Sequence, residues 1–199
     1  GSFCPIHKGH LKLFDTAAKF LSEEHKIDSI LGIINPTSYI FVSQKFGSST
    51  ISFEHRYEMT KMACLEHNKN LENDPKCLKI IPDSWEGTQI DFLDFQIVYN
   101  HFKIEIEEMF HDENLLVLYV CGGDLFIKRK CNKRNGIVGI SRPGFQIKAS
   151  TDVKNNLYVC NDKKYAGAYN DASFAINLAK ESGESIEGLT YDSVAKYLH

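Results

Sequence analysis

The chain has 199 residues, and its 43% apolar and 25% charged residues are close to the averages of globular proteins. This length allows one domain with a sizeable core, and the composition excludes a collagen-like or disordered chain. The 23 basic and 26 acidic residues give a net charge of −3, which disfavours a duplex nucleic-acid binder. Small phosphorylated ligands are not excluded, because they need only a local site.

In the first half of the chain, the hydrophobic pattern predicts helices that alternate with short strands. A run of apolar and β-branched residues predicts a strand buried on both faces, and Asn35-Pro36 breaks it. Ser52 is a suitable N-cap for the helix that follows. The expected elements are a helix over 10–26, the buried strand over 29–34, a loop over 37–51, a helix over 52–67 and a strand over 77–81.

The second half continues the alternation of helices and strands. The expected elements are a helix over 88–110, strands over 115–121, 137–141 and 157–160, and closing helices over 171–182 and 190–198, the last with Thr190 as N-cap and with Tyr191, Val194 and Leu198 on one face. Strands that alternate with helices imply βαβ units. We therefore predict an α/β fold with a mostly parallel sheet, helices on both of its faces, and a small helical extension over 160–199 of a single domain, 1–199.

The six cysteines form no Cys-x-x-Cys pair, and several lie inside apolar runs. This pattern favours reduced, buried thiols and an intracellular compartment over a disulfide framework. The compartment could be cytoplasmic, nuclear or mitochondrial. There is no apolar stretch of about 18 residues and no signal-peptide pattern, so we expect no membrane span.

The most informative segment is the first ten residues, GSFCPIHKGH. Gly1 and Ser2 would let backbone N–H groups approach a phosphate, and Gly9 would let a ligand approach the backbone. His7 and His10 lie three residues apart, on one side of the first turn of the expected helix. The N-terminus of that helix adds partial positive charge and N–H donors. Together these features predict an anion site with two imidazoles.

A second cationic segment, residues 127–136, carries five lysines and arginines. It is interpreted either as a solvated surface turn or as a loop that faces phosphate.

Several motifs in chain order carry a family resemblance. GSFCPIHKGH resembles the signature of the HxGH nucleotidyltransferase superfamily, which binds ATP on a Rossmann-like sheet. The closer resemblance is to the eukaryotic-type nicotinamide-mononucleotide (NMN) adenylyltransferases. It rests on the segments IINPTSYIFV, ISFEHRYEM, PDSWEGTQ, VCGGDLF, GISRPG and SGESIEGLTYDSVAKYL. These segments cover nearly the whole chain.

The resemblance implies roles for individual residues. His10 would contact the ATP phosphates and stabilise the transition state, and His7 would also face the phosphates. The further ATP-binding residues would be Gly1, Ser2, Phe3, Gly122, Asp124, Arg142 and Ser173. The residues for NMN would be Trp85, Glu86, Thr88 and Lys45. Trp85, the only tryptophan, would stack on the nicotinamide ring, as suits a cationic pyridinium. The alternatives to these binding roles are purely structural: Trp85 could be a core tryptophan, and Asp124 could be a helix N-cap.

The second ATP signature of the family departs from its usual form here. Where the family has Ser-Ser-Thr-x-Ile-Arg, this chain has Ala172-Ser173-Phe174-Ala175-Ile176-Asn177, so the phosphate-binding arginine is absent. Basic residues of 127–136 could compensate for it. In addition, the apolar strand that precedes the signature in the family is not in the sequence, and the segment after Phe126 is shorter. Either residues before Gly1 and after Phe126 are missing from the sequence, or the domain is degenerate.

The resemblance therefore implies an adenylyltransferase that makes NAD from ATP and NMN, or nicotinate mononucleotide, with release of pyrophosphate and with Mg²⁺ accompanying ATP. The alternative is a degenerate relative that serves as a binding or scaffold subunit. A nucleotidyltransferase for pantetheine phosphate or glycerol phosphate is a third possibility. The expected partners are small molecules rather than nucleic acid, and the chain could form a homo-oligomer or join a larger assembly.

Overall fold

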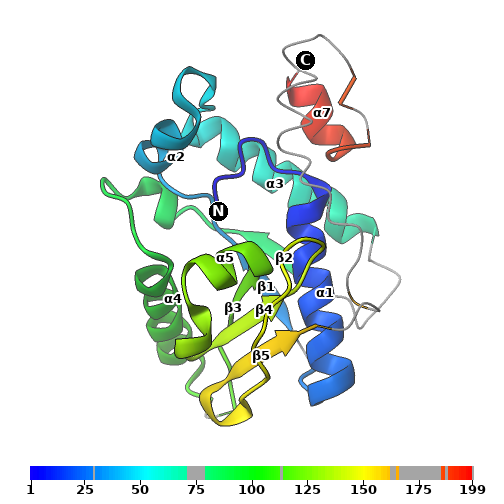
Figure 1. Ribbon diagram of the computed structural model, residues 1–199. Coiled ribbons are helices and arrows are strands. Elements are labelled where there is room, and N and C mark those ends of the chain that lie inside the picture. Colours follow the sequence, from blue (N-terminus) through cyan, green and yellow to red (C-terminus); the bar gives the residue numbers. More distant parts are fainter. Residues whose placement is uncertain are drawn as a thin grey trace. The chain divides into compact units, whose positions relative to one another are not determined.

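The computed structural model describes residues 1–28, 30–70, 79–112, 114–161, 165, 185–186 and 188–198. The described residues fall into two compact units. Those within Gly1–Phe14, Asp28–Leu93 and Asn170–His199 make the first unit, and those within Asp15–Ile27 and Asp94–Tyr169 make the second. Each unit contains a parallel sheet with helices, so the α/β class and the parallel pairing are confirmed (Figure 1).

The first unit has a two-stranded sheet. Strands β1 and β2 pair in parallel, in a register that runs from Leu31 opposite Lys79 to Ile34 opposite Pro82. Ile34 and Ile80 are fully buried in the core. The elements of this unit are the start of α1 (Lys8–His25), β1 (Leu31–Ile34), α2 (Tyr39–Phe46), η1 (Gly47–Ser49), α3 (Phe53–Asn70), β2 (Lys79–Pro82), η2 (Glu86–Thr88) and α7 (Asp192–Leu198).

The C-terminal helix α7 is fixed to α3 by a carboxylate. Glu66 of α3 accepts hydrogen bonds from the backbone N–H groups of Asp192 and Ser193, at 3.2 and 3.0 Å, and from the Ser193 hydroxyl at 2.7 Å. These N–H groups belong to the first turn of α7 and have no partner within the helix. The expected N-cap, Thr190, was therefore wrong, since its hydroxyl donates instead to the carbonyl of Ile6 at 2.8 Å.

The second unit has three parallel strands in the order β3-β4-β5. Tyr119 lies opposite Ile137, and Ile137 lies opposite Leu157. Beside the C-terminal part of α1, its elements are α4 (Phe95–Phe110), β3 (Tyr119–Gly122), α5 (Gly123–Lys128), η3 (Cys131–Lys133), β4 (Ile137–Ile140), η4 (Val153–Asn155) and β5 (Leu157–Cys160). Its core consists of Phe95, Cys121, Phe126, Cys131, Ile137, Ile147, Leu157 and Val159.

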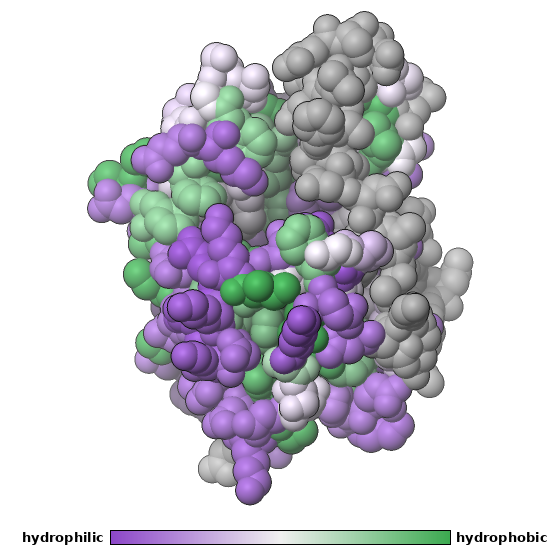
Figure 2. Space-filling view, viewed as in Figure 1, coloured by the Kyte–Doolittle hydropathy of each residue, from purple (hydrophilic) through white to green (hydrophobic). Residues whose placement is uncertain are grey.

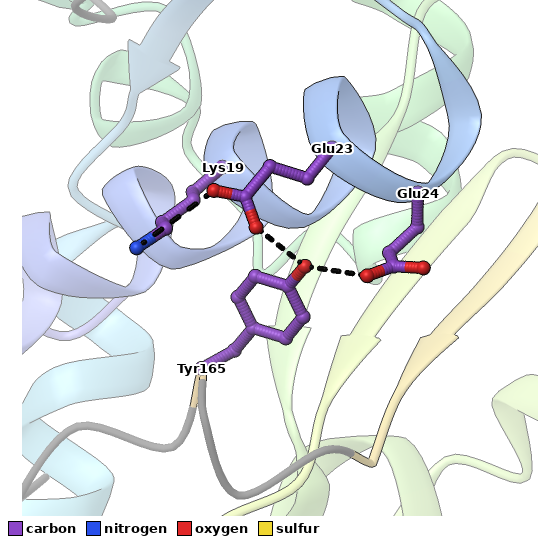
Figure 3. A network of polar contacts seen from close by, with 4 residues as sticks. All are labelled: Lys19, Glu23, Glu24 and Tyr165. Atoms are coloured by element: carbon purple, nitrogen blue, oxygen red, sulfur yellow. Dashed lines mark hydrogen bonds and ion pairs between the residues drawn. The ribbon is translucent and has the colours of Figure 1, made fainter.

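A tyrosine after β5 anchors the C-terminal part of α1 in the second unit (Figure 3). The Tyr165 hydroxyl lies 2.8 Å from a carboxylate oxygen of Glu23 and 2.8 Å from one of Glu24. The Tyr165 ring is buried and meets the Phe20 ring edge to face at 5.6 Å. Lys19 adds an ion pair to Glu23 at 3.8 Å. Buried ring contacts and charged hydrogen-bond acceptors thus hold this helix from one side.

Three of the elements expected between residues 29 and 110 were wrong in extent or type. The strand over 29–34 begins at Leu31, which is 56% exposed, so it is not buried on both faces. The expected loop over 37–51 contains α2 and η1, because Val42 is buried and Phe41 stacks on Phe92 at 4.5 Å. The helix expected over 88–110 begins only at Phe95, after Asp94 at its N-cap.

The strand expected over 115–121 begins only at Tyr119. Its partner β4 begins opposite that residue, and the Tyr119 N–H already bonds to the carbonyl of Gly136 at 2.8 Å. The ladder therefore has no partner for the residues before Tyr119. The helix over 52–67 is confirmed as α3, and the Ser52 hydroxyl accepts from the N–H of His55 at 3.4 Å. The helix expected over 171–182 lies outside the described residues.

Five cysteines lie in the described part of the chain, and each is a buried free thiol, as predicted: Cys4, Cys64, Cys121, Cys131 and Cys160. None of the helices in that part is both long and apolar enough to cross a membrane.

Candidate active site

His7 and His10 are brought together at the start of α1. Their ring centroids lie 3.6 Å apart, and the Phe3 ring meets His10 edge-on at 4.8 Å. His7 is buried, whereas His10 is half-buried. Helix α1 begins at Lys8, so His7 occupies the capping position and His10 is the third helical residue. The spacing of three in the sequence thus becomes a contact between two imidazoles.

The local hydrogen bonds orient the His10 ring. The backbone N–H of His7 donates to Nδ1 of His10 at 3.1 Å. This is the arrangement in which a third helical residue reaches back to the N–H of the capping residue. Because Nδ1 accepts this bond, the proton of the neutral imidazole resides on Nε2. His10 therefore presents an N–H donor at a helix N-terminus, where an anion is favoured.

The signature loop is joined to the loop that follows β1. The nitrogen of Gly1 donates to the carbonyl of Asn35 at 2.7 Å, and the N–H of Thr37 donates to the carbonyl of Gly1 at 2.8 Å. Asn35 directly follows the last residue of β1. The residues expected to line a nucleotide cleft, Gly1–Phe3, thus lie along the carboxyl end of that strand, where open α/β sheets place their ligands.

A buried arginine of α3 fixes this arrangement. Arg56 has no exposed surface, and its guanidinium donates to three backbone carbonyls. The acceptors are Ser2 at 2.9 Å, Thr37 at 2.9 Å and Ile51 at 3.1 Å. Burial lowers the pKa of Arg56 from its ordinary value. One charged side chain therefore connects the signature loop, the loop after β1 and the start of α3.

The segment with Trp85 meets the same loop through Asp83. A single carboxylate oxygen of Asp83 accepts from the side-chain amide of Asn35 and from the N–H of Trp85, both at 2.7 Å. Trp85 is half-buried, Glu86 is buried and Thr88 is exposed. The Thr88 hydroxyl donates to the Trp85 carbonyl at 2.9 Å. The carboxyl ends of β1 and β2 thus bring the segment with Trp85 next to the loop after β1 that holds the signature loop.

The expected NMN residue Lys45 lies on a helix instead of a loop. It belongs to the last turn of α2, and its ammonium group lies 4.8 Å from the centroid of the Phe46 ring.

Sequence reasoning missed three polar residues beside the signature loop. In the loop after β1, three buried oxygen atoms have no hydrogen-bond partner among the described residues: Oδ1 of Asn35, Oγ1 of Thr37 and Oγ of Ser38. An unsatisfied buried polar atom is costly, so such atoms are candidates to bind a ligand or water. The signal in the sequence was the polar run Asn35–Ser38 directly after a buried strand.

In the second unit, two expected ATP residues contact each other. Asp124 follows β3 and Arg142 follows β4, and the guanidinium lies 3.1 Å from the carboxylate. The Arg142 guanidinium also lies over the Phe145 ring at 4.9 Å. Gly122 ends β3, and its neighbour Gly123 packs so closely that an added Cβ would lie 2.1 Å from the Phe145 carbonyl oxygen. The turn at the end of β3 therefore admits no side chain at 123.

The basic segment 127–136 leads to the opposite end of the same sheet, where its strands begin. It ends at Gly136, which pairs with the first residue of β3, whereas Asp124 and Arg142 follow the last residues of β3 and β4. Arg129 pairs with Asp94 at 3.7 Å, and Arg134 donates to Gln96 at 3.1 Å. Arg129 and Arg134, two of the basic residues expected to compensate in the second ATP signature, thus already have partners in the protein.

Ser173, the remaining expected ATP residue, lies outside the described residues. Among those that are described, no group of three or more His, Cys, Asp or Glu side chains could hold a metal ion.

Comparisons with known proteins agree with the resemblance seen in the sequence. The family model described as Cytidylyltransferase-like matches residues 1–173. Nicotinamide/nicotinic acid mononucleotide adenylyltransferase 1 of Saccharomyces cerevisiae is 31% identical over 106 residues, 53% of this chain and 23% of that protein. Nicotinamide/nicotinic acid mononucleotide adenylyltransferase 2 of Xenopus tropicalis is 33% identical over 90 residues, 44% of this chain and 26% of that protein. The matched part of the chain thus spans about a quarter of each relative.

Proposed function

The chain belongs to the cytidylyltransferase-like family of nucleotidyltransferases, and from this premise we propose that it is a nicotinamide-nucleotide adenylyltransferase. Its substrates would be ATP, accompanied by Mg²⁺, and NMN or nicotinate mononucleotide. The products would be the dinucleotide, NAD in the case of NMN, and pyrophosphate. The names of the two relatives support this choice of substrates.

The reaction needs no nucleophile from the protein. An oxygen of the 5′-phosphate of the mononucleotide forms a bond to the α-phosphorus of ATP. The bond from that phosphorus to the bridging oxygen breaks, and pyrophosphate leaves with the electron pair. Positioning and electrostatic stabilisation of the transferring phosphoryl group supply the rate.

The geometry of His10 carries the proposal. Its Nδ1 is occupied by the N–H of His7 at 3.1 Å, so Nε2–H is the donor that it can offer to a phosphate oxygen. His7, whose ring lies 3.6 Å away, and the N–H groups at the start of α1 would add to the same positive region. In the same unit, Trp85 would stack on the pyridinium ring, and Glu86, Thr88 and Lys45 are proposed to surround the mononucleotide.

The test measures binding and catalysis in one sample. NMN and NAD would be titrated calorimetrically into the full chain, and pyrophosphate release would then be followed with ATP and Mg²⁺. We expect His10→Ala to lower kcat about 100-fold or more, as for loss of a transition-state donor, with little change in the affinity for NMN. His101→Ala, at a half-buried histidine of α4 in the second unit, is the matched control. An unchanged kcat in His10→Ala would remove His10 from this role.

One observation favours a second candidate, a degenerate relative that binds nucleotide without catalysis. Arg142, a proposed phosphate ligand, is already paired with Asp124, and the second ATP signature lacks its arginine at Asn177. Binding of NMN without release of pyrophosphate would favour this candidate. Absence of both would point to a scaffold subunit.

We also propose that residues 1–199 form one nucleotidyltransferase domain, and that Gly1, Ser2, Phe3, Gly122, Asp124, Arg142 and Ser173 bind ATP. The five buried free thiols support an intracellular compartment.

A further inference from the structure

The second unit contains a polar hollow that the proposed reaction does not use. It has a volume of about 450 Å³ and lies between α4 and the loop before β4. Figure 2 shows mainly hydrophilic side chains over this part of the unit. The lining residues are Gln96, Tyr99, Asn100, Lys103, Lys133, Arg134 and Asn135.

The charge in this hollow is positive. Of its three cations, Lys103 is paired with Glu107 at 3.2 Å. Within the described residues, neither Lys133 nor Arg134 has a carboxylate within ion-pair distance. The nearby carboxylate of Asp94 is paired with Arg129 at 3.7 Å. Among the residues that the structure describes, no carboxylate therefore neutralises the two positive charges of Lys133 and Arg134 in the hollow.

The wall that carries this charge is held in place. The Arg134 guanidinium donates to Oε1 of Gln96 at 3.1 Å and lies 4.8 Å from the centroid of the Phe95 ring. Gln96 in turn donates to Oδ1 of Asn100 at 3.2 Å. A guanidinium fixed in this way still has N–H donors directed elsewhere, and its planar fork matches the oxygens of a phosphate. The Arg134 side chain of this wall is thus oriented before any ligand arrives.

The hollow is separate from the proposed nucleotide residues of the same unit. Lys133–Asn135 precede β4, whereas Asp124 and Arg142 follow β3 and β4. These strands have four residues each, so about 13 Å of backbone separates the residues before the strands from those after them. A ligand in the hollow would therefore not occupy the place expected for ATP.

We propose that this hollow binds the phosphate group of a small soluble molecule. Two uncompensated cations and neighbouring neutral donors from Asn135 and Tyr99 suit one phosphate dianion. A nucleic acid fits less well, because it is held by many phosphate contacts along an extended basic surface, and the whole chain has a net charge of −3.

The test follows the backbone amide signals of the ¹⁵N-labelled full chain by NMR during titration with inorganic phosphate, against sodium chloride at equal ionic strength. We expect saturable shifts at Tyr99, Arg134, Asn135 and Gly136. The variant Lys133→Gln/Arg134→Gln should weaken this binding about tenfold or more, since charge-assisted contacts are lost. The control Lys128→Gln/Lys154→Gln removes two charges from exposed positions of the same unit outside the hollow and should change affinity less than twofold.

Each outcome decides the matter. Because Arg134 also packs on Phe95, Lys133→Glu serves as a second variant, at a side chain that is exposed. Phosphate shifts that are absent from the hollow, or unchanged in Lys133→Glu, would overturn the proposal. A short single-stranded RNA that binds the same amides more tightly than phosphate would overturn the assignment to a small ligand. Amide shifts at Ser2–His10 report separately on the proposed active site. If the proposed function fails, the phosphate titration of the hollow can therefore still be interpreted.

Discussion

Arg56 should be the side chain on which the geometry of the signature loop depends most. Arg56→Met keeps an extended stem but leaves three buried carbonyls, of Ser2, Thr37 and Ile51, without their donor. Hydrogen bonds from a charged group contribute about 1.5–3 kcal/mol each. Their sum is offset by the several kcal/mol that burial of a guanidinium costs. We therefore expect the free energy of unfolding to fall by about 3 kcal/mol, or Tm by about 6–12 °C.

Urea unfolding followed by the fluorescence of Trp85, the only tryptophan, measures this loss within the first unit. Arg56→Lys keeps the charge but not the planar fork, so its loss should be intermediate. Arg129→Met is the control, because its ion pair with Asp94 is about one-third exposed and should contribute less than about 1 kcal/mol. If Arg56→Met is no less stable than Arg129→Met, the three carbonyl contacts do not hold the loop.

Three further predictions concern other contacts. Glu66→Gln should lower the free energy of unfolding by about 1 kcal/mol at pH 7, because Glu66 caps α7. Burial acts to raise the pKa of Glu66, but hydrogen bonds from Ser193 and Asp192 hold it below 4.5. The free energies of unfolding of variant and parent, measured in urea, should therefore converge as the pH falls below that value. Burial raises the pKa of Cys64 to about 12. Mass spectrometry after iodoacetamide treatment at pH 8 should therefore find Cys64 unmodified in the folded chain. Labelling of Cys64 as fast as in urea would contradict this. Gly136→Ala should cost about 1–3 kcal/mol in thermal unfolding, since φ is +69° and the new Cβ would lie 2.2 Å from the Tyr99 hydroxyl; full stability would refute the contact.

The contact between His7 and His10 was predictable because its determinants are local. His7 and His10 are three residues apart at a helix start, and helical geometry alone brings residues at that spacing to one face. The positions of Trp85 and Asp124 after strands followed from strand patterns and from the rule for open α/β sheets. Each of these inferences needed no knowledge of which distant segments touch.

The features that were missed depend on contacts between distant segments. Helix α2 was expected as a loop, but the stack of Phe41 on Phe92 stabilises it across about 50 residues of sequence. Glu66 replaces Thr190 as the cap of α7 over an even longer separation. Nothing in the local sequence distinguishes Arg56 from other arginines on helices. Only the fold places three carbonyls around it. Local pattern carries no signal for such contacts.

The pair of Asp124 and Arg142 shows how such a contact changes a functional inference. Taken separately in the sequence, each residue is a candidate ligand of ATP. In the structure the carboxylate lies 3.1 Å from the guanidinium, and the two charges neutralise each other. A phosphate that binds Arg142 must compete with Asp124, so it gains less than it would from an unpaired arginine. The resemblance to the family also implies that Asn177 stands in place of the signature arginine, so the proposed activity depends more heavily on His10 and the N-terminus of α1.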